Sequence, residues 1–272
     1  MEIRDDATAE EIREFYAADL PRRLRARIDG NLRIDRAIEF MTARVEVDDR
    51  ILDIGCGIGV ATEKLAANAE EGRVWALDIS PAHIDYCRRT IERPNLEFFT
   101  LNVVEEFTRL DEIVDGDLDV VTMVDVLEHL PQEAASELFA NLGGRLSDRG
   151  RILLTYPSPT YQRHLYETEG SRLQAIDRIV EIDEILDLAK SAGCELRHFS
   201  HVDVWRRDQY IHCELVRTFQ QERFDPWGDW SGASAARRAQ ICTTFLRQKV
   251  RGVLRPLRRR QFLVDPLADD TP

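Results

Sequence analysis

The chain has 272 residues, with 37 Lys or Arg against 50 Asp or Glu, so its formal net charge is −13. Hydrophobic residues make up 43% and charged residues 32%, a balance that is typical of globular proteins and excludes disorder or a collagen-like repeat for the whole chain. An acidic chain lacks the positive field that phosphate backbones attract, so the composition argues against a general nucleic-acid binder.

The sequence also indicates a compartment. No stretch of about 18 apolar residues occurs, so no transmembrane helix is expected. Residues 1–12 are acidic and lack the apolar centre of a signal peptide. The cysteines are five in number, scattered and without a C-x-x-C pair, which favours a reducing compartment over a disulfide framework or a zinc site. We therefore expect a cytoplasmic protein.

In chain order, the first predicted elements are helices. Apolar residues recur at helical spacing through residues 9–46, and Pro21 and Gly30 are expected to break this stretch into shorter helices.

From residue 50 onward, short apolar runs alternate with segments of helical periodicity. This alternation predicts an α/β fold with a Rossmann-like, mostly parallel sheet and helices on both faces. The expected strands are residues 50–54, 73–77, 96–101, 118–124, 151–156, 195–204 and 209–216. The expected helices between them are residues 61–69, 82–91, 132–146 and 181–192.

A glycine-rich turn, I-L-D-I-G-C-G-I-G, ends the first expected strand at residues 51–59. Glycine lets the backbone turn sharply and lets a ligand lie directly on it. Asp53, just before the turn, can hold a ligand ammonium group directly or through water. Asp78 ends the second strand, where an acidic side chain accepts from both hydroxyls of a ribose.

The spacing of the glycines narrows the choice of ligand. The dinucleotide fingerprint G-x-G-x-x-G, counted from Gly55, requires its third glycine at residue 60. This chain has Val60 there, and its third glycine, Gly59, comes one place too early. A ligand with a ribose and an amino group, but without phosphate, fits better. S-adenosylmethionine (SAM) is such a ligand.

Three segments together resemble the class I SAM-dependent methyltransferases. The glycine turn resembles their first motif. Residues 119–131, D-V-V-T-M-V-D-V-L-E-H-L-P, resemble the fourth-strand motif of the ubiquinone-biosynthesis O-methyltransferase branch. Residues 150–155, G-R-I-L-L-T, resemble the fifth-strand motif. The resemblance covers about residues 30–216 and implies a seven-stranded sheet whose last strand is antiparallel.

This resemblance also implies a division of the chain. The three expected parts are N-terminal helices that cover the cofactor site (1–46), a SAM-binding domain (47–218) with an acceptor-site insertion (157–180), and a basic helical tail (219–272).

The resemblance implies a set of residues around SAM. The set is Arg33, Asp53, Gly55, Cys56, Gly57, Gly59, Asp78, Ile79, Asn102, Val103, Val124 and Asp125. Within it, Arg33 would pair with the SAM carboxylate through a bidentate contact. Asn102 departs from the family's usual Asp beside the adenine, although its carbonyl can still accept from the adenine amino group.

A methyl acceptor with a hydroxyl or phenol group benefits from a general base. His129, just after the fourth strand, and His164, in the insertion, are the candidate bases, although His129 can equally shape its loop. No metal is expected, and the alternative is a Mg²⁺ site of Asp125, Glu128 and His129.

Aromatic and polar residues follow the fifth strand, where this fold commonly builds its acceptor pocket. Tyr156, Tyr161, Gln162 and His164 are therefore the predicted substrate contacts. The alternative is a lid helix whose tyrosines pack on the sheet.

The tail combines charge with amphipathicity. Residues 231–260 contain nine basic and no acidic residues, with apolar residues at helical intervals. We expect this helix to dock on the acidic domain or to form a contact between two copies, as in a homodimer. Peripheral binding to an anionic membrane is the alternative.

These patterns predict a SAM-dependent methyltransferase that acts on an oxygen of a small-molecule acceptor, with no nucleic-acid partner. The alternatives are an N- or C-methyltransferase, an enzyme acting on a lipid-linked glycan, or a SAM-binding regulatory module without transfer activity.

Overall fold

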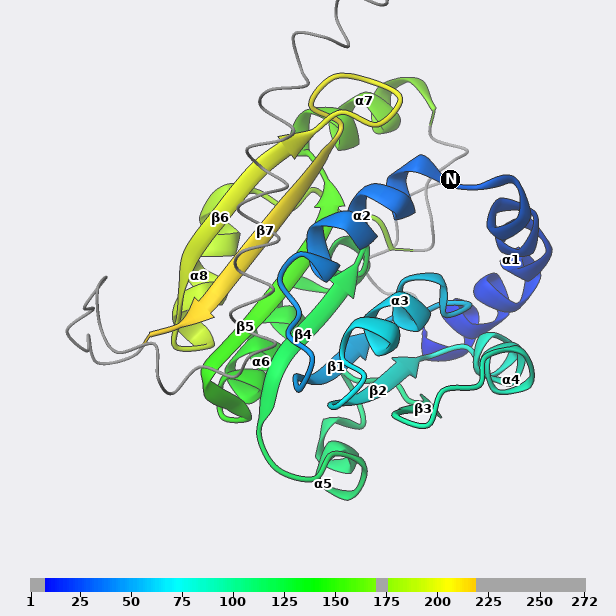
Figure 1. The fold of residues 1–272 in the computed structure, drawn as a ribbon. Helices are drawn as coiled ribbons and strands as arrows, with labels where there is room; N and C mark the ends of the chain where they lie inside the picture. The colour runs from blue at the N-terminus through cyan, green and yellow to red at the C-terminus, as the bar shows by residue number, and fades with distance from the viewer. Residues whose placement is uncertain (1–7, 170–175, 219–272) are drawn as a thin grey trace, which may run out of the picture. The chain divides into compact units, whose positions relative to one another are not determined.

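The computed structural model describes residues 8–169 and 176–218, which contain one seven-stranded sheet and its flanking helices (Figure 1). The strands are β1 (Arg50–Ile54), β2 (Arg73–Asp78), β3 (Leu96–Thr100), β4 (Leu118–Val124), β5 (Leu146–Pro157), β6 (Cys194–Val202) and β7 (Tyr210–Arg217). The α-helices are α1 (Ala9–Asp29), α2 (Leu32–Thr42), α3 (Val60–Asn68), α4 (Pro81–Thr90), α5 (Leu110–Ile113), α6 (Gln132–Gly143), α7 (Pro159–Thr168) and α8 (Ile182–Ser191). Two short 3-10 helices are η1 (Phe107–Arg109) and η2 (Leu127–His129).

The strand order is β3-β2-β1-β4-β5-β7-β6. Strand β7 pairs antiparallel with both of its neighbours, whereas the other pairs are parallel. The predicted Rossmann-like sheet with an antiparallel last strand is therefore confirmed. The order reverses between β1 and β4, and ligands of open α/β sheets bind at such a switch point, at the carboxyl ends of the strands.

Both faces of the sheet are buried, because successive residues of a strand point to opposite sides. Ile51 belongs to a core cluster with α2 and α3, which contribute Phe40 and Leu65. Leu52 belongs to the larger cluster on the other face, with residues of α6 and α8. Figure 1 shows these two pairs of helices on opposite sides of the sheet.

The expected break of the first helix at Pro21 is wrong. Helix α1 continues through Pro21 and ends before Gly30, whose φ of +86° favours glycine. An internal proline removes one helical hydrogen bond. Here Asp19 forms ion pairs with Arg22 and Arg23, which span the proline and help to hold both halves of the helix together.

The predicted helix over residues 132–146 is too long. Helix α6 ends at Gly143, and β5 already begins at Leu146. The backbone approaches α8 closely here, since a Cβ atom on Gly143 would lie 2.5 Å from the carbonyl oxygen of Ala192. In the described part of the insertion, Ser158 caps α7 by accepting a hydrogen bond from the backbone N–H of Tyr161 (3.2 Å).

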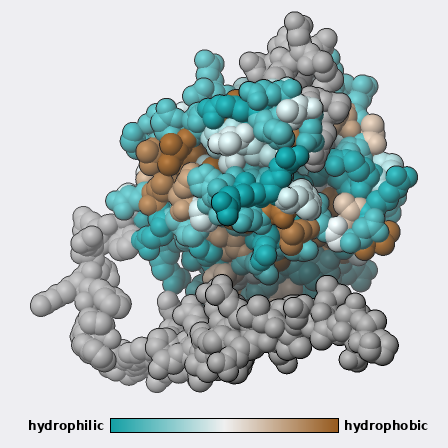
Figure 2. All heavy atoms as spheres, turned by 90° about the horizontal axis from the view of Figure 1, so that it is seen from above, coloured by the Kyte–Doolittle hydropathy of each residue, from teal (hydrophilic) through white to brown (hydrophobic). Residues whose placement is uncertain are grey.

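Hydrophilic residues predominate on the face shown in Figure 2, where hydrophobic residues form separate patches. None of the helices that the structure describes is long and apolar enough to cross a bilayer. The predicted contacts of the basic tail fall within residues 219–272 and lie outside the described residues.

Candidate active site

The glycine turn joins β1 to α3 at the switch point of the sheet. Gly55, Gly57 and Gly59 have φ values of +73°, +55° and +75°, a region that side chains rarely adopt. The N–H groups of Gly55 and Cys56 both donate to the carbonyl of Leu77 (2.8 and 2.9 Å), which fixes the turn to β2.

The three glycines differ in what surrounds them. A Cβ atom on Gly55 would lie 2.4 Å from Val126, and one on Gly59 would lie 2.5 Å from Ile91. On Gly57 it would meet only the Nη1 atom of Arg23, at 3.4 Å. Gly55 and Gly59 are therefore required by packing, whereas the backbone of Gly57 is open to a ligand.

Asp78 stands at the carboxyl end of β2, beside the turn. Its Oδ2 atom accepts from the Gly57 N–H (2.8 Å). Its Oδ1 atom accepts from the Ser80 N–H (2.9 Å) and lies 3.2 Å from Nδ1 of His83. These contacts hold a carboxylate at the wall of the site, where it can accept further hydrogen bonds.

Asp53 is buried below the turn. Its two oxygens accept from the hydroxyls of Thr62 (2.6 Å) and Thr122 (2.7 Å), and Thr122 is its register partner on β4. Burial raises the pKa of Asp53 to about 6, against the effect of the two hydroxyls. The two threonines are missing from the predicted set. The polar residue Thr122 within the apolar run of β4 is the signal that could have revealed one of them.

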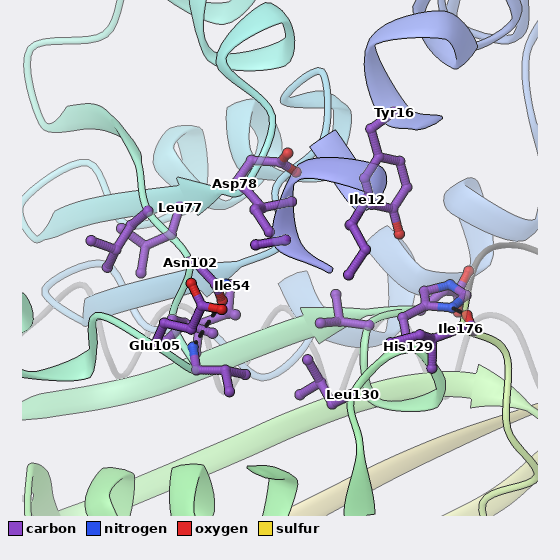
Figure 3. A pocket seen from close by; sticks show the side chains of 18 of the residues that line it. Ile12, Tyr16, Ile54, Leu77, Asp78, Asn102, Glu105, His129, Leu130 and Ile176 are labelled. Carbon is purple, nitrogen blue, oxygen red and sulfur yellow. Dashed lines mark hydrogen bonds between the residues drawn. The ribbon is translucent and has the colours of Figure 1, made fainter. Parts of the chain in front are cut away.

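Two cavities flank the glycine turn. One, of about 200 Å³, extends from Asp78 to His129 (Figure 3). The other, of about 170 Å³, lies over Asp53 and Gly57. Together they bring the predicted cofactor residues to one place, because all of them except Gly59 line one cavity or the other. The residues common to both are Arg23, Gly55, Val124 and Asp125.

His129 lines the first cavity from η2. Its Nδ1 atom lies 2.6 Å from the carbonyl oxygen of Ile176, which can only accept, so the ring proton sits on Nδ1. The Nε2 atom then carries the lone pair, and it lies 3.8 Å from Oε1 of Glu128. Burial lowers the pKa of His129, and it raises the pKa of the neighbouring Glu128 to about 8. The imidazole is thus neutral near pH 7 and can accept a proton.

Helix α1 supplies part of the cavity wall that the sequence patterns do not reveal. Ile12, Tyr16 and Arg23 line the first cavity. In Figure 3 the Tyr16 ring extends from α1 into the cavity, with its hydroxyl on the side of His129. Burial raises the pKa of Tyr16. The helical spacing of these residues shows that they share a face, but not what that face covers.

The predicted acceptor contacts lie elsewhere. Tyr156 is fully buried in the larger core cluster, on the same face of β5 as Ile152 and Leu154. Gln162 is also buried and donates to the carbonyl of Asp177 (3.3 Å). His164 is partly exposed on α7, and Tyr161 packs near Tyr210 with ring centroids 5.9 Å apart. None of the four predicted side chains lines either of the two cavities, so their acceptor role stays a prediction.

The alternative metal site has other bonding. Asp125 forms an ion pair with Arg33 and accepts from the hydroxyl of Thr155 (2.9 Å). Glu128 is buried. Across residues 8–169 and 176–218, no group of three or more His, Cys, Asp or Glu side chains is placed to hold a metal ion.

Comparison with known proteins agrees with this geometry. Residues 51–150 match a family model described as a methyltransferase domain. A ubiquinone biosynthesis O-methyltransferase of Nitrosococcus oceani is 30% identical over 122 residues, which cover 45% of this chain and 49% of that protein. The chain thus spans about half the length of this relative. A trans-aconitate 2-methyltransferase of Escherichia coli is 28% identical over 203 residues, which cover 70% of this chain and 74% of that protein.

The fold comparison points the same way. The crystal structure of magnesium protoporphyrin IX methyltransferase from Synechocystis PCC 6803 with bound SAH superposes with a TM-score of 0.60 at 19% identity. The superposition covers 78% of this chain and all of that one. The family match thus covers residues 51–150 with a methyltransferase domain, and the superposition shows that the chain shares the fold of this methyltransferase.

Proposed function

We propose that the protein binds SAM and transfers its methyl group to an oxygen, a hydroxyl or phenol, of a small-molecule acceptor. The observation that supports this most directly is the carboxylate of Asp78, hydrogen-bonded to the N–H of the ligand-accessible Gly57 at the wall of the cavities. That arrangement suits a ribose beside a glycine turn. Asp53 supplies a buried carboxylate for an ammonium group, and Asn102 and Val103 line the end expected for the adenine.

His129 fits the role of the general base. SAM, when bound, supplies an electrophilic methyl group. The acceptor hydroxyl would lose its proton to Nε2 of His129 as its oxygen forms the new bond to the methyl carbon, and the carbon–sulfur bond would break to leave SAH. The carbonyl of Ile176 keeps the other ring nitrogen protonated, so the lone pair stays on Nε2.

The lining of the first cavity supports an apolar acceptor. The walls of this cavity are mostly hydrophobic, and Ile12, Leu130 and Ile176 line it together with His129 (Figure 3). A phenol presents a flat apolar ring and one hydroxyl, which suits such a wall. Some relatives are named for methylation of ribosomal RNA or tRNA. The net charge of −13 weighs against a polyanionic acceptor here.

The proposal is tested by incubating the protein with methyl-labelled SAM and a panel of phenols, sugars and amines. We expect the label on an oxygen of a phenol or another hydroxyl compound. Label found only on nitrogen would reject the O-methyltransferase. Tight SAM binding without transfer to any compound would favour a regulatory module.

Replacing Gly57 with alanine is expected to weaken binding of S-adenosylhomocysteine (SAH) by about tenfold or more, because the new methyl group occupies ligand space. The positive φ should cost about 1–2 kcal/mol of stability. Gly193→Ala is the matched control, since Gly193 also has a positive φ (+63°) but nothing within 4 Å of its Cβ position. Calorimetric titration and thermal melting measure both effects. Equal SAH affinity in the two variants would contradict a ligand at Gly57.

SAH binding is also expected to depend on pH through Asp53. An ammonium group pairs with the ionised carboxylate only, and this group has a pKa of about 6 in the free protein. Lowering the pH from about 7 to about 5 should therefore weaken SAH by about tenfold, whereas affinity levels off above the pKa. Asp53→Asn should be weak and lack this dependence. Asp35→Asn, an exposed carboxylate at the same cavity, should retain it. A profile that Asp53→Asn leaves unchanged would refute this role.

A further inference from the structure

The imidazole of His129 depends on a segment that lies far from it in the sequence. Ile176, whose carbonyl oxygen lies 2.6 Å from Nδ1 of His129, begins the described stretch between α7 and α8. Figure 3 shows both residues at the wall of the first cavity. Residues 177–181 belong to no helix or strand, so their position depends on hydrogen bonds to neighbouring elements.

Arg178 connects this segment to the turn that carries His129. Its backbone N–H donates to the carbonyl of Glu128 (2.9 Å). Its guanidinium donates from Nη2 to the carbonyl of Leu127 (3.3 Å) and from Nε to the carbonyl of Leu130. One residue therefore binds the backbone of η2 and of the residue after it at three points, on both sides of His129 along the chain.

The third nitrogen of the same guanidinium is anchored on α8. Nη1 of Arg178 pairs with Oε2 of Glu184 at 2.6 Å, and only 14% and 9% of the two side chains are exposed. Helix α8 packs into the larger core cluster through Ile185 and Leu188. The η2 turn is therefore tied to a helix of the core, because the planar fork of arginine lets one side chain reach all three partners.

Asp177, between Ile176 and Arg178, is held by α7. Its carbonyl accepts from Nε2 of Gln162 (3.3 Å) and from the hydroxyl of Tyr166. The segment that supplies the Ile176 carbonyl is therefore bonded to α7 at residue 177 and to η2 and α8 at residue 178. These contacts limit how far that carbonyl can move from the imidazole.

We propose that Arg178 is a positioning residue for His129. It holds the η2 turn against residues 176–178, so that the carbonyl of Ile176 keeps its hydrogen bond to Nδ1 and the lone pair of the imidazole stays on Nε2. The use of this lone pair in methyl transfer rests on the proposed function, because it requires His129 to be the base. The position of the ring proton does not, and it can be measured without SAM or acceptor.

The test replaces Arg178 with lysine, which keeps a positive charge for Glu184 but cannot reach both carbonyls of the turn. In protein with isotope-labelled histidine, nitrogen NMR reports which ring nitrogen carries the proton, and His129→Ala assigns the signal. We expect the proton on Nδ1 in the wild type and a mixture of both tautomers in Arg178→Lys. With a hydroxyl acceptor, kcat should fall by about 10- to 100-fold, while SAH affinity changes by less than about twofold.

Arg217→Lys is the matched control. Arg217 also donates to two backbone carbonyls, those of Gly143 and Leu146, but it does so where β5 begins and lines neither cavity. This variant should match the wild type in the tautomer of His129, in kcat and in SAH affinity.

Three outcomes would overturn the inference. The first is an unchanged tautomer of His129 in Arg178→Lys. The second is an equal loss of kcat and SAH affinity in that variant, which would show that Arg178 only stabilises the fold. The third is the same loss of kcat in Arg217→Lys. A wild-type protein that methylates no hydroxyl compound would instead refute the proposed function, and the tautomer would still decide whether Arg178 positions His129.

Discussion

Replacing His129 with alanine is expected to lower kcat for a hydroxyl acceptor by about 100- to 10,000-fold and to leave SAH affinity unchanged. The variant removes the group that takes the acceptor proton, while the contacts of Asp78 and the glycine turn remain. In the wild type, the acidic limb of the pH–kcat profile should lie below the usual pKa of histidine, because burial lowers the pKa of His129. Steady-state kinetics with methyl-labelled SAM measure both quantities.

His164→Ala distinguishes the two histidines that the sequence offers as bases. His164 is partly exposed on α7 and lines neither cavity, so we expect this variant to keep its kcat. A loss confined to His164→Ala would exchange the two roles. Unchanged rates in both variants would show that no histidine acts as the base.

Asp78→Asn is expected to weaken SAH binding by about 100- to 10,000-fold, the effect of two charged hydrogen bonds to the ribose at about 1.5–3 kcal/mol each. The amide also disturbs the turn if its NH₂ group faces the N–H of Gly57 or of Ser80. We expect the free energy of unfolding to fall by about 1–3 kcal/mol for that reason. Titration with SAH and chemical denaturation separate the two effects.

Asp85→Asn, an exposed carboxylate on α4, is the control for the removal of one negative charge and should match the wild type in both measurements. If Asp78→Asn lost stability but bound SAH with wild-type affinity, Asp78 would serve only to hold the turn.

Most of the fold could be predicted because each element leaves a local pattern. Ile51 and Leu52 lie in core clusters on opposite faces, so both are apolar, and a continuous apolar run of this kind is typical of a strand in a parallel sheet. The failures arose where distant contacts decide the boundary. Helix α1 passes Pro21 with ion pairs across it, and α6 ends at Gly143 where α8 comes close.

The site shows the same division. Asp53, Gly57 and Asp78 could be predicted because their position at the ends of adjacent parallel strands already brings them together. Tyr16 could not be recognised as part of the cavity wall, because its place depends on how α1 lies over the sheet. The tautomer of His129 depends on a carbonyl 47 residues away, at Ile176. Such contacts between distant segments leave no periodicity or spacing in the sequence.

The most direct test of the account is a crystal structure of the protein with SAM. We predict the ribose hydroxyls on Asp78, the amino acid over Gly57 and Asp53, and the sulfonium methyl group directed into the cavity beside His129. SAM bound elsewhere, or a methyl group directed at a wall with no space for an acceptor, would contradict the proposed methyltransferase.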